Sequence, residues 1–203
     1  LFTIVGVAFM LFLGGWQVQR LLWKEDLIST RQARFATVIV PPPATAAAAA
    51  IDQFEFNRVR LTGVFLHDHE MYLGSRSLMG HVGYHVITPL RRDDDSLVLV
   101  DRGWVPLDYK DPTPRAAAQF EGPVSLQGVI RAPGRKSRFT PDNVPQDNFW
   151  FYVDLPAMAA ASGLDPFASW YVEADAEANP GGFPVGGQSR VDLPNDHLHY
   201  AIT

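Results

Sequence analysis

The sequence of 203 residues contains no cysteine. This absence excludes disulfides, thiolate nucleophiles, zinc ribbons and cysteine-ligated clusters, so any metal ligand has to be histidine, a carboxylate, tyrosine or methionine. Basic residues are also few: 17 stand against 22 acidic residues, which gives a formal charge of −5 and a pI near 5.6. This sign of charge argues against a protein that binds along phosphate backbones, and we expect no nucleic-acid partner.

Motifs of common enzyme classes are missing as well. The sequence has no G-x-S-x-G nucleophile elbow and no H-E-x-x-H zinc motif. The richest glycine cluster, at 181–188, lacks the lysine of a phosphate-binding loop, and its Pro184 has no amide hydrogen. We therefore interpret this cluster as a tight irregular loop, and the sequence gives no support for a serine hydrolase or a zincin.

The N-terminal sixteen residues form an uncharged, almost wholly apolar run. Sixteen residues are fewer than the roughly 20 that cross a bilayer as a helix, and the chain begins with Leu1, so we expect upstream residues to complete a transmembrane helix. A signal-peptide hydrophobic region and a buried core helix are the alternatives. Apolar and aromatic residues continue at helical spacing, which predicts a membrane helix with an extension over residues 1–30. The residues at this spacing are Leu13, Trp16, Arg20, Trp23 and Leu27.

The C-terminal end has the signature of a second helix. Asn195 and Asp196 are good N-cap residues, and the chain then continues with mostly apolar residues to its end. We expect residues 195–203 to be the start of a second transmembrane helix that is cut off, and residues 31–194 to form the soluble domain.

The composition between these ends predicts a β-rich domain. About 150 residues suffice for one domain, and 47% of the residues are hydrophobic, so one core is expected. Strand-like runs follow one another with few helices between them, which predicts an α+β fold: a mainly antiparallel β-sheet or partly closed barrel with short helices, flanked by transmembrane helices. The predicted strands are 58–66, 69–73, 82–88, 97–100, 124–130 and 149–153.

Three local patterns complete the predicted domain. The Pro/Ala-rich insert at 41–50 predicts a solvated linker or surface flap. Charges of both signs at 91–95 are typical of a hairpin tip. Asp154 as a cap and Gly163 as a stop predict a short helix at 155–162.

The histidines suggest two different sites. On a strand, His67 and His69 would point to one face, as in β-barrel metal sites, with His81 or His85 as a third ligand. This arrangement would indicate a metal-dependent β-barrel enzyme. Because Glu70 would point to the opposite face, two exposed turn histidines are the preferred interpretation.

His197 is the second candidate metal ligand. In the first turn of the expected C-terminal helix, the positive end of the helix dipole disfavours imidazolium and leaves a ring nitrogen free to bind metal. Tyr200 would lie on the same helix face. An amphipathic border residue is the simpler interpretation of this position alone.

Several segments together give a family resemblance. The segments are Gly15-Trp16-Gln17-x-x-Arg20-x-x-Trp23-Lys24, Gly83-Tyr84, Thr88-Pro89, Leu99-Val100-Asp101-Arg102-Gly103-Trp104-Val105-Pro106, Gly128-x-x-Arg131, Gly182-x-Pro184-x-Gly186-Gly187-Gln188-x-Arg190-Val191 and Asn195-x-His197-Leu198-x-Tyr200-x-x-Thr203. With these segments in this order and spacing, the chain resembles the Surfeit locus protein 1 family of membrane-anchored assembly factors for haem-copper cytochrome c oxidase.

The resemblance implies a topology and a location. Two membrane helices would flank one soluble domain, which faces the periplasm at the bacterial cytoplasmic membrane or the intermembrane space at the mitochondrial inner membrane. Basic residues from Arg20 to Arg34 follow the first helix closely, and the positive-inside rule alone would place that side in the cytoplasm. Long translocated domains follow this rule poorly, so we expect the family topology.

The resemblance also implies a protein that is not an enzyme and that transiently carries a cargo, haem a. The expected partners are the catalytic subunit I of cytochrome c oxidase, the lipid bilayer and, as a source of cargo, haem a synthase. A carrier needs an axial ligand for the iron, an apolar wall and cations for the propionates. The expected residues are His197 for the iron, Trp16, Trp23 and Tyr200 for the wall, and Arg102 or Arg190 for the propionates.

Besides the metal-dependent enzyme, the sequence is compatible with two further alternatives. The chain would act as a scaffold if it held an oxidase assembly intermediate without binding haem. Arg102 and Trp104 would be structural if they formed a strand end with a packed aromatic and an ion pair to Asp101 or Glu121.

Overall fold

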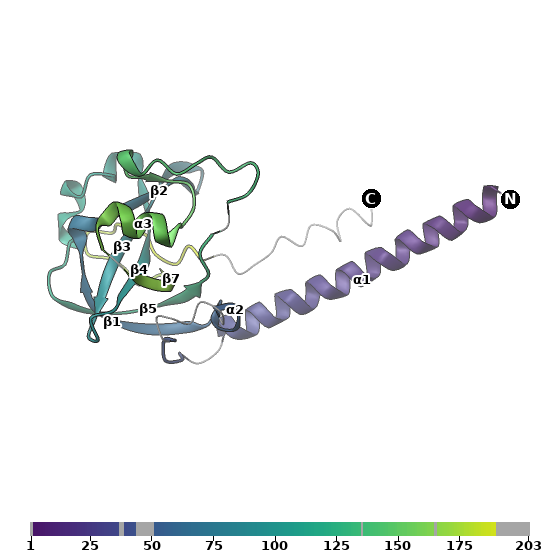
Figure 1. Ribbon diagram of the computed structural model, residues 1–203, viewed down its shortest axis with the longest axis horizontal. Coiled ribbons are helices and arrows are strands. Elements are labelled where there is room, and N and C mark those ends of the chain that lie inside the picture. Colours follow the sequence, from purple (N-terminus) through teal and green to yellow (C-terminus); the bar gives the residue numbers. More distant parts are fainter. Residues whose placement is uncertain (1, 37–38, 44–50, 135, 165, 190–203) are drawn as a thin grey trace. The chain divides into compact units, whose positions relative to one another are not determined.

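The structure is a computed structural model that describes residues 2–36, 39–43, 51–134, 136–164 and 166–189. It contains two compact units: one holds the N-terminal helix, and the other spans Val38–Ser189. Figure 1 shows the helix and the β-rich unit.

Helix α1 (Phe2–Ala36) is a single helix of 35 residues without a proline to interrupt it. Its segment Thr3–Arg31 is long and apolar enough to cross a membrane, and none of its most apolar window is buried. The helix continues beyond residue 30 to Ala36. A candidate N-terminal membrane helix is therefore present, whereas the predicted second helix at 195–203 lies outside the described residues.

The second unit contains one mixed sheet of seven strands in the described part of the chain. The sheet order is β1-β5-β7-β4-β3-β2-β6, and β1 also pairs with β3, with Val64 opposite Arg91. This last pairing closes β1, β5, β7, β4 and β3 into a five-stranded barrel (Figure 1). The strands are β1 (Arg58–Phe65), β2 (Met71–Leu78), β3 (His81–Arg92), β4 (Leu97–Pro106), β5 (Pro123–Arg131), β6 (Phe149–Trp150) and β7 (Phe167–Ala174).

The sheet departs from the predicted one in two ways. Strand β7 was not predicted, and it pairs in parallel with β4, as β6 does with β2; the other pairs are antiparallel. Strand β2 begins later than predicted, because the 3-10 helix η2 (His67–His69) occupies the first of those residues. The barrel is thus mainly antiparallel, as predicted, but it is closed rather than partly closed, and its β4–β7 pair is parallel.

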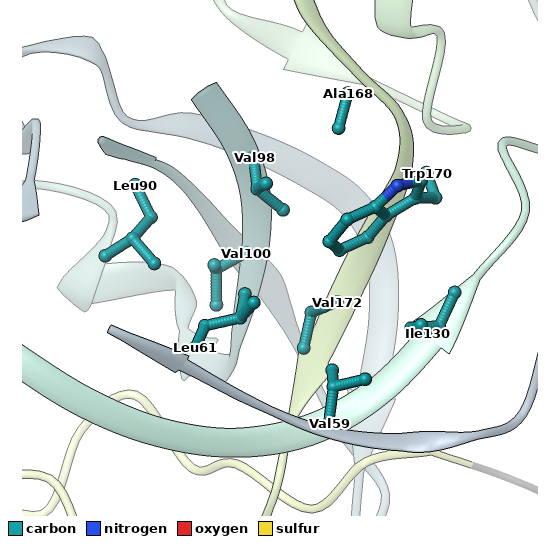
Figure 2. Close-up of a cluster of buried hydrophobic side chains, with 9 residues drawn as sticks. All are labelled: Val59, Leu61, Leu90, Val98, Val100, Ile130, Ala168, Trp170 and Val172. Atoms are coloured by element: carbon teal, nitrogen blue, oxygen red, sulfur yellow. The ribbon is translucent and has the colours of Figure 1, made fainter. Parts of the chain in front are cut away.

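The barrel interior is filled by side chains from all five of its strands. Trp170 of β7 is the largest of them and is fully buried among aliphatic residues of the neighbouring strands. Figure 2 shows the nine side chains converging inside the barrel. Each buried aliphatic side chain contributes about 1.5–3 kcal/mol to folding. The residues are Val59, Leu61, Leu90, Val98, Val100, Ile130, Ala168, Trp170 and Val172.

A second buried cluster lies under helix α3 (Leu155–Ser162), which packs against β7. The side chain of Asp154 accepts a hydrogen bond from the Ala157 amide, 3.1 Å away, and Gly163 ends the helix with φ of 68°. These residues confirm the predicted cap and stop. Trp150 and Met158 are fully buried in the cluster.

The connections are short helices and tight turns. The charged segment at 91–95 forms the predicted hairpin tip between β3 and β4. The Pro/Ala-rich insert is described only at residues 41–43, where Pro41 is exposed and Pro43 is buried; residues 44–50 lie outside the described residues, so the linker or flap stays a prediction. The remaining helices are α2 (Ile51–Phe54), η3 (Leu107–Tyr109), η4 (Thr113–Ala118) and η5 (Pro145–Asp147).

The glycine cluster at 181–188 is an irregular loop, as predicted, and it is fixed to the barrel. Val185 and Trp104 exchange two backbone hydrogen bonds of 2.8 and 2.9 Å. Gly103 has φ of +117°, and the Val185 carbonyl occupies the position where a Cβ would lie. Only glycine allows this approach without strain.

Candidate functional site

A buried carboxylate, that of Glu70, organises a polar network beside the barrel. Glu70 lies between η2 and β2 and is 7% exposed. Arg115 of η4 donates to both of its oxygens, over 3.1 Å to Oε1 and 2.5 Å to Oε2. Arg102 of β4 and Gln119 also donate to Oε1, over 3.2 and 3.1 Å. Two guanidinium groups therefore share one carboxylate.

The network keeps Glu70 ionised. Burial alone would raise the pKa of its carboxyl, but hydrogen bonds with His67, Arg115 and Gln119 and the charge of Arg115 lower that pKa to about 2. Tyr72 donates its hydroxyl proton to Glu70 over 3.3 Å. Burial and the Glu70 charge raise the pKa of Tyr72 to about 12, so its hydroxyl stays a neutral donor.

Arg102 connects this network to a cavity. Its Nη2 donates to the Ala118 carbonyl over 2.6 Å and to Asn179 Oδ1 over 3.4 Å, and its guanidinium lies 4.8 Å from the centre of the Phe65 ring. Burial lowers the pKa of Arg102. The cavity has a volume of about 160 Å³, and Arg102 is part of its wall. Its apolar lining includes Phe65, Phe120, Val124, Leu126, Ala178 and Pro180.

The histidines at 67 and 69 do not form the metal pair of a β-barrel. They lie on the 3-10 helix η2 instead of a strand, so the alternation that would align them on one face does not apply. The expected exposure was wrong for both histidines, which are half-buried; the His67 side chain is 13% exposed and hydrogen-bonds the Phe120 carbonyl over 3.1 Å. Among the described residues, no group of three potential metal ligands comes together.

His85 and Asp101 form a separate pair across β3 and β4. His85 Nδ1 lies 2.8 Å from Asp101 Oδ2, and the other carboxylate oxygen accepts the Gly103 amide over 2.9 Å. Because a carboxylate only accepts, Nδ1 carries the proton and Nε2 holds the lone pair in the neutral ring.

Comparison of the sequence with known proteins identifies the family of this chain. The family model described as "SURF1 family" matches residues 4–203. The chain belongs to the SURF1 family. This family is known for assembly factors of cytochrome c oxidase, and the relatives described below are not named as enzymes.

Relatives in the SURF1 family span animals and a choanoflagellate. A SURF1-like protein of Monosiga brevicollis is 39% identical, over 94% of this chain and 76% of its own length. A SURF1-like protein of Drosophila melanogaster is 38% identical, and Surfeit locus protein 1 of Homo sapiens is 35% identical. Both alignments cover 94% of this chain and 67% of the relative.

The predicted site residues are only partly described. Trp16 and Trp23 lie on α1, 46% and 63% exposed, and the Arg20 guanidinium lies 5.2 Å from the centre of the Trp16 ring. Arg102 lies in the buried network. The other predicted residues, Arg190, His197 and Tyr200, lie outside the described residues, so the ligand set remains a prediction.

The structure corrects the expected partner of Arg102. Adjacent strand residues point to opposite faces, so Asp101 pairs with His85 while Arg102 pairs with Glu70. Trp104 is packed as expected, 6% exposed and 6.2 Å from the Phe183 ring centre.

Sequence reasoning missed most of the network. Glu70, Arg115 and Gln119 were not among the predicted site residues. Glu70 adjoins two histidines in the sequence, and that cluster was the only signal that a polar site begins there.

Proposed function

We propose that this chain is a membrane-anchored assembly factor for haem-copper cytochrome c oxidase that binds haem a and delivers it to catalytic subunit I. The observation that carries this proposal is the family match over residues 4–203. The candidate membrane span at Thr3–Arg31 supports the anchor. The chain acts at the bacterial cytoplasmic membrane with its barrel in the periplasm, or at the mitochondrial inner membrane, and it receives its cargo near haem a synthase.

Each chemical feature of haem a has a counterpart in the chain. A ring nitrogen of His197 ligates the iron, and the hydrocarbon tail stays in the bilayer beside the anchor. The exposed indoles of Trp16 and Trp23, together with Tyr200, supply an apolar wall. Arg190 and Arg102 are the cations for the propionates.

Delivery requires weak binding. A carrier releases its cargo only if the acceptor binds it more tightly, which favours one protein ligand and an open sixth position on the iron. Only the bond between His197 and the iron breaks on release, and no covalent bond within haem a changes, so the chain acts as a carrier and has no catalytic residue.

The test is to produce the full-length protein in cells with and without haem a synthesis and to record the visible spectrum of the purified protein. The proposal predicts haem a absorbance in the first preparation and none in the second. A colourless protein from both cells that still binds oxidase subunit I would contradict haem carriage and establish the scaffold instead.

A further inference from the structure

The buried network has one more positive than negative charge. The side chains of Arg102 and Arg115 are 5% and 1% exposed, and both pair with Glu70. Within the part of the chain that the structure describes, neither guanidinium contacts a second carboxylate. A buried charge without a counter-ion is strongly disfavoured, because its desolvation is not repaid.

The surplus charge is better assigned to Arg102 than to Arg115. Arg115 donates hydrogen bonds to both oxygens of Glu70, and its Nε donates to the Tyr109 carbonyl over 3.0 Å. Arg102 reaches only one Glu70 oxygen, and its contact with the neutral Asn179 amide is long, at 3.4 Å. Arg102 and Asn179 both line the cavity, so the surplus charge lies at its wall.

The cavity suits a short apolar chain. Its walls are mostly apolar, and its volume of about 160 Å³ lies below the roughly 300–1,000 Å³ of pockets that enclose whole drug-sized molecules. A substituent fits, whereas a porphyrin ring does not. Of the two acidic residues in the lining, Asp175 is engaged by Arg58 and Glu177 is solvent-exposed.

We propose that this cavity binds a carboxylate carried on a short aliphatic chain, with Arg102 as its counter-ion. The inference rests on the proposed function where that carboxylate is a propionate of haem a. A free short-chain fatty acid presents the same chemistry, and the experiment separates the two sources.

The first arm titrates hexanoate and the neutral hexanamide into the full chain in detergent, following the amide resonances of Ala118, Gln119 and Asn179. Hexanoate is expected to bind at least about tenfold more tightly, since a hydrogen bond between two charged groups exceeds a neutral one by that order. Ala178→Trp, which fills the cavity from an exposed position, should abolish these shifts. Ala160→Trp, on the exposed face of α3, should leave them unchanged.

The second arm compares haem with its dimethyl ester. The unmodified chain is expected to bind the ester at least about tenfold more weakly than haem. Ala178→Trp is expected to bind the ester and haem with equal affinity. If the chain binds hexanoate in preference to hexanamide but does not bind haem, the proposed function is overturned and the carboxylate site is supported. Haem and ester binding with equal affinity, or hexanoate and hexanamide shifting the same resonances equally, would overturn the carboxylate site.

Discussion

Both carboxylate oxygens of Glu70 accept hydrogen bonds from the single guanidinium of Arg115. This fork ties η4 to the start of β2, two segments far apart in the sequence. Bidentate pairs of this kind fix direction as well as distance. Because Arg102 shares the same carboxylate, the geometry of the cavity wall depends on Glu70.

Glu70→Gln should strongly destabilise the barrel unit. The amide keeps the shape but leaves two buried guanidinium groups without a counter-ion, which costs about 3–5 kcal/mol. Urea unfolding of the full chain in detergent measures this loss. Glu121→Gln, at an exposed position, is the matched control and should change stability by less than about 0.5 kcal/mol. Equal stability of the two variants would show that the network is not a stabilising feature.

Acid should weaken the fold through Glu70. Its folded-state pKa of about 2 lies below the ordinary value of 4.5, so its contribution is present above pH 4.5 and is lost as the pH falls from 4.5 towards 2. This depression corresponds to about 3 kcal/mol. The stability difference between wild type and Glu70→Gln should therefore narrow by most of that amount in urea titrations between pH 6 and pH 2.5. A stability difference that stays constant across this pH range would contradict the lowered folded-state pKa of Glu70.

Asp101→Asn should reverse the tautomer of His85. In the wild type, Asp101 accepts the Nδ1 proton, and in the variant the amide donates to Nδ1 and moves the ring proton to Nε2. Imidazole ¹⁵N shifts distinguish the two forms, and the exchange of partners should cost about 1–3 kcal/mol. Asp108→Asn, at an exposed position, should leave the His85 shifts unchanged. A wild-type ring protonated only at Nε2 would refute this arrangement.

Gly103→Ala should detach the 181–188 loop from β4. A Cβ at this position meets the Val185 carbonyl, and φ of +117° is strained for any other residue. We expect a loss of at least about 2 kcal/mol in urea unfolding. Gly134→Ala is the control, because its nearest neighbour lies 3.4 Å from the new carbon. If both variants unfold at the same urea concentration, the close approach of Gly103 to the Val185 carbonyl does not contribute to stability.

Local sequence signals predicted the elements that depend on local chemistry. The cap at Asp154 and the stop at Gly163 define α3, and the alternation in β1 and the charged hairpin tip between β3 and β4 were also readable. These features arise from hydrogen bonds and side-chain alternation within a few residues.

The missed features depend on partners distant in the sequence. Strand β7 lies between β4 and β5, and a parallel partner for β4 has no short-range signal. The pairing of Arg102 with Glu70 likewise joins residues 32 positions apart. A basic residue that will be buried is not distinguishable in sequence from one on the surface, so the burial of Arg115 could not be predicted.

The most direct test of haem carriage compares His197→Ala with His199→Ala in the full-length protein, produced in cells that make haem a. The two histidines are two residues apart, so both substitutions disturb the same segment of chain. We expect His197→Ala to purify with less than about a tenth of the wild-type haem a absorbance, because the single axial bond is lost, and His199→Ala to keep that absorbance. Wild-type absorbance in His197→Ala, or equal loss in both variants, would contradict ligation by His197.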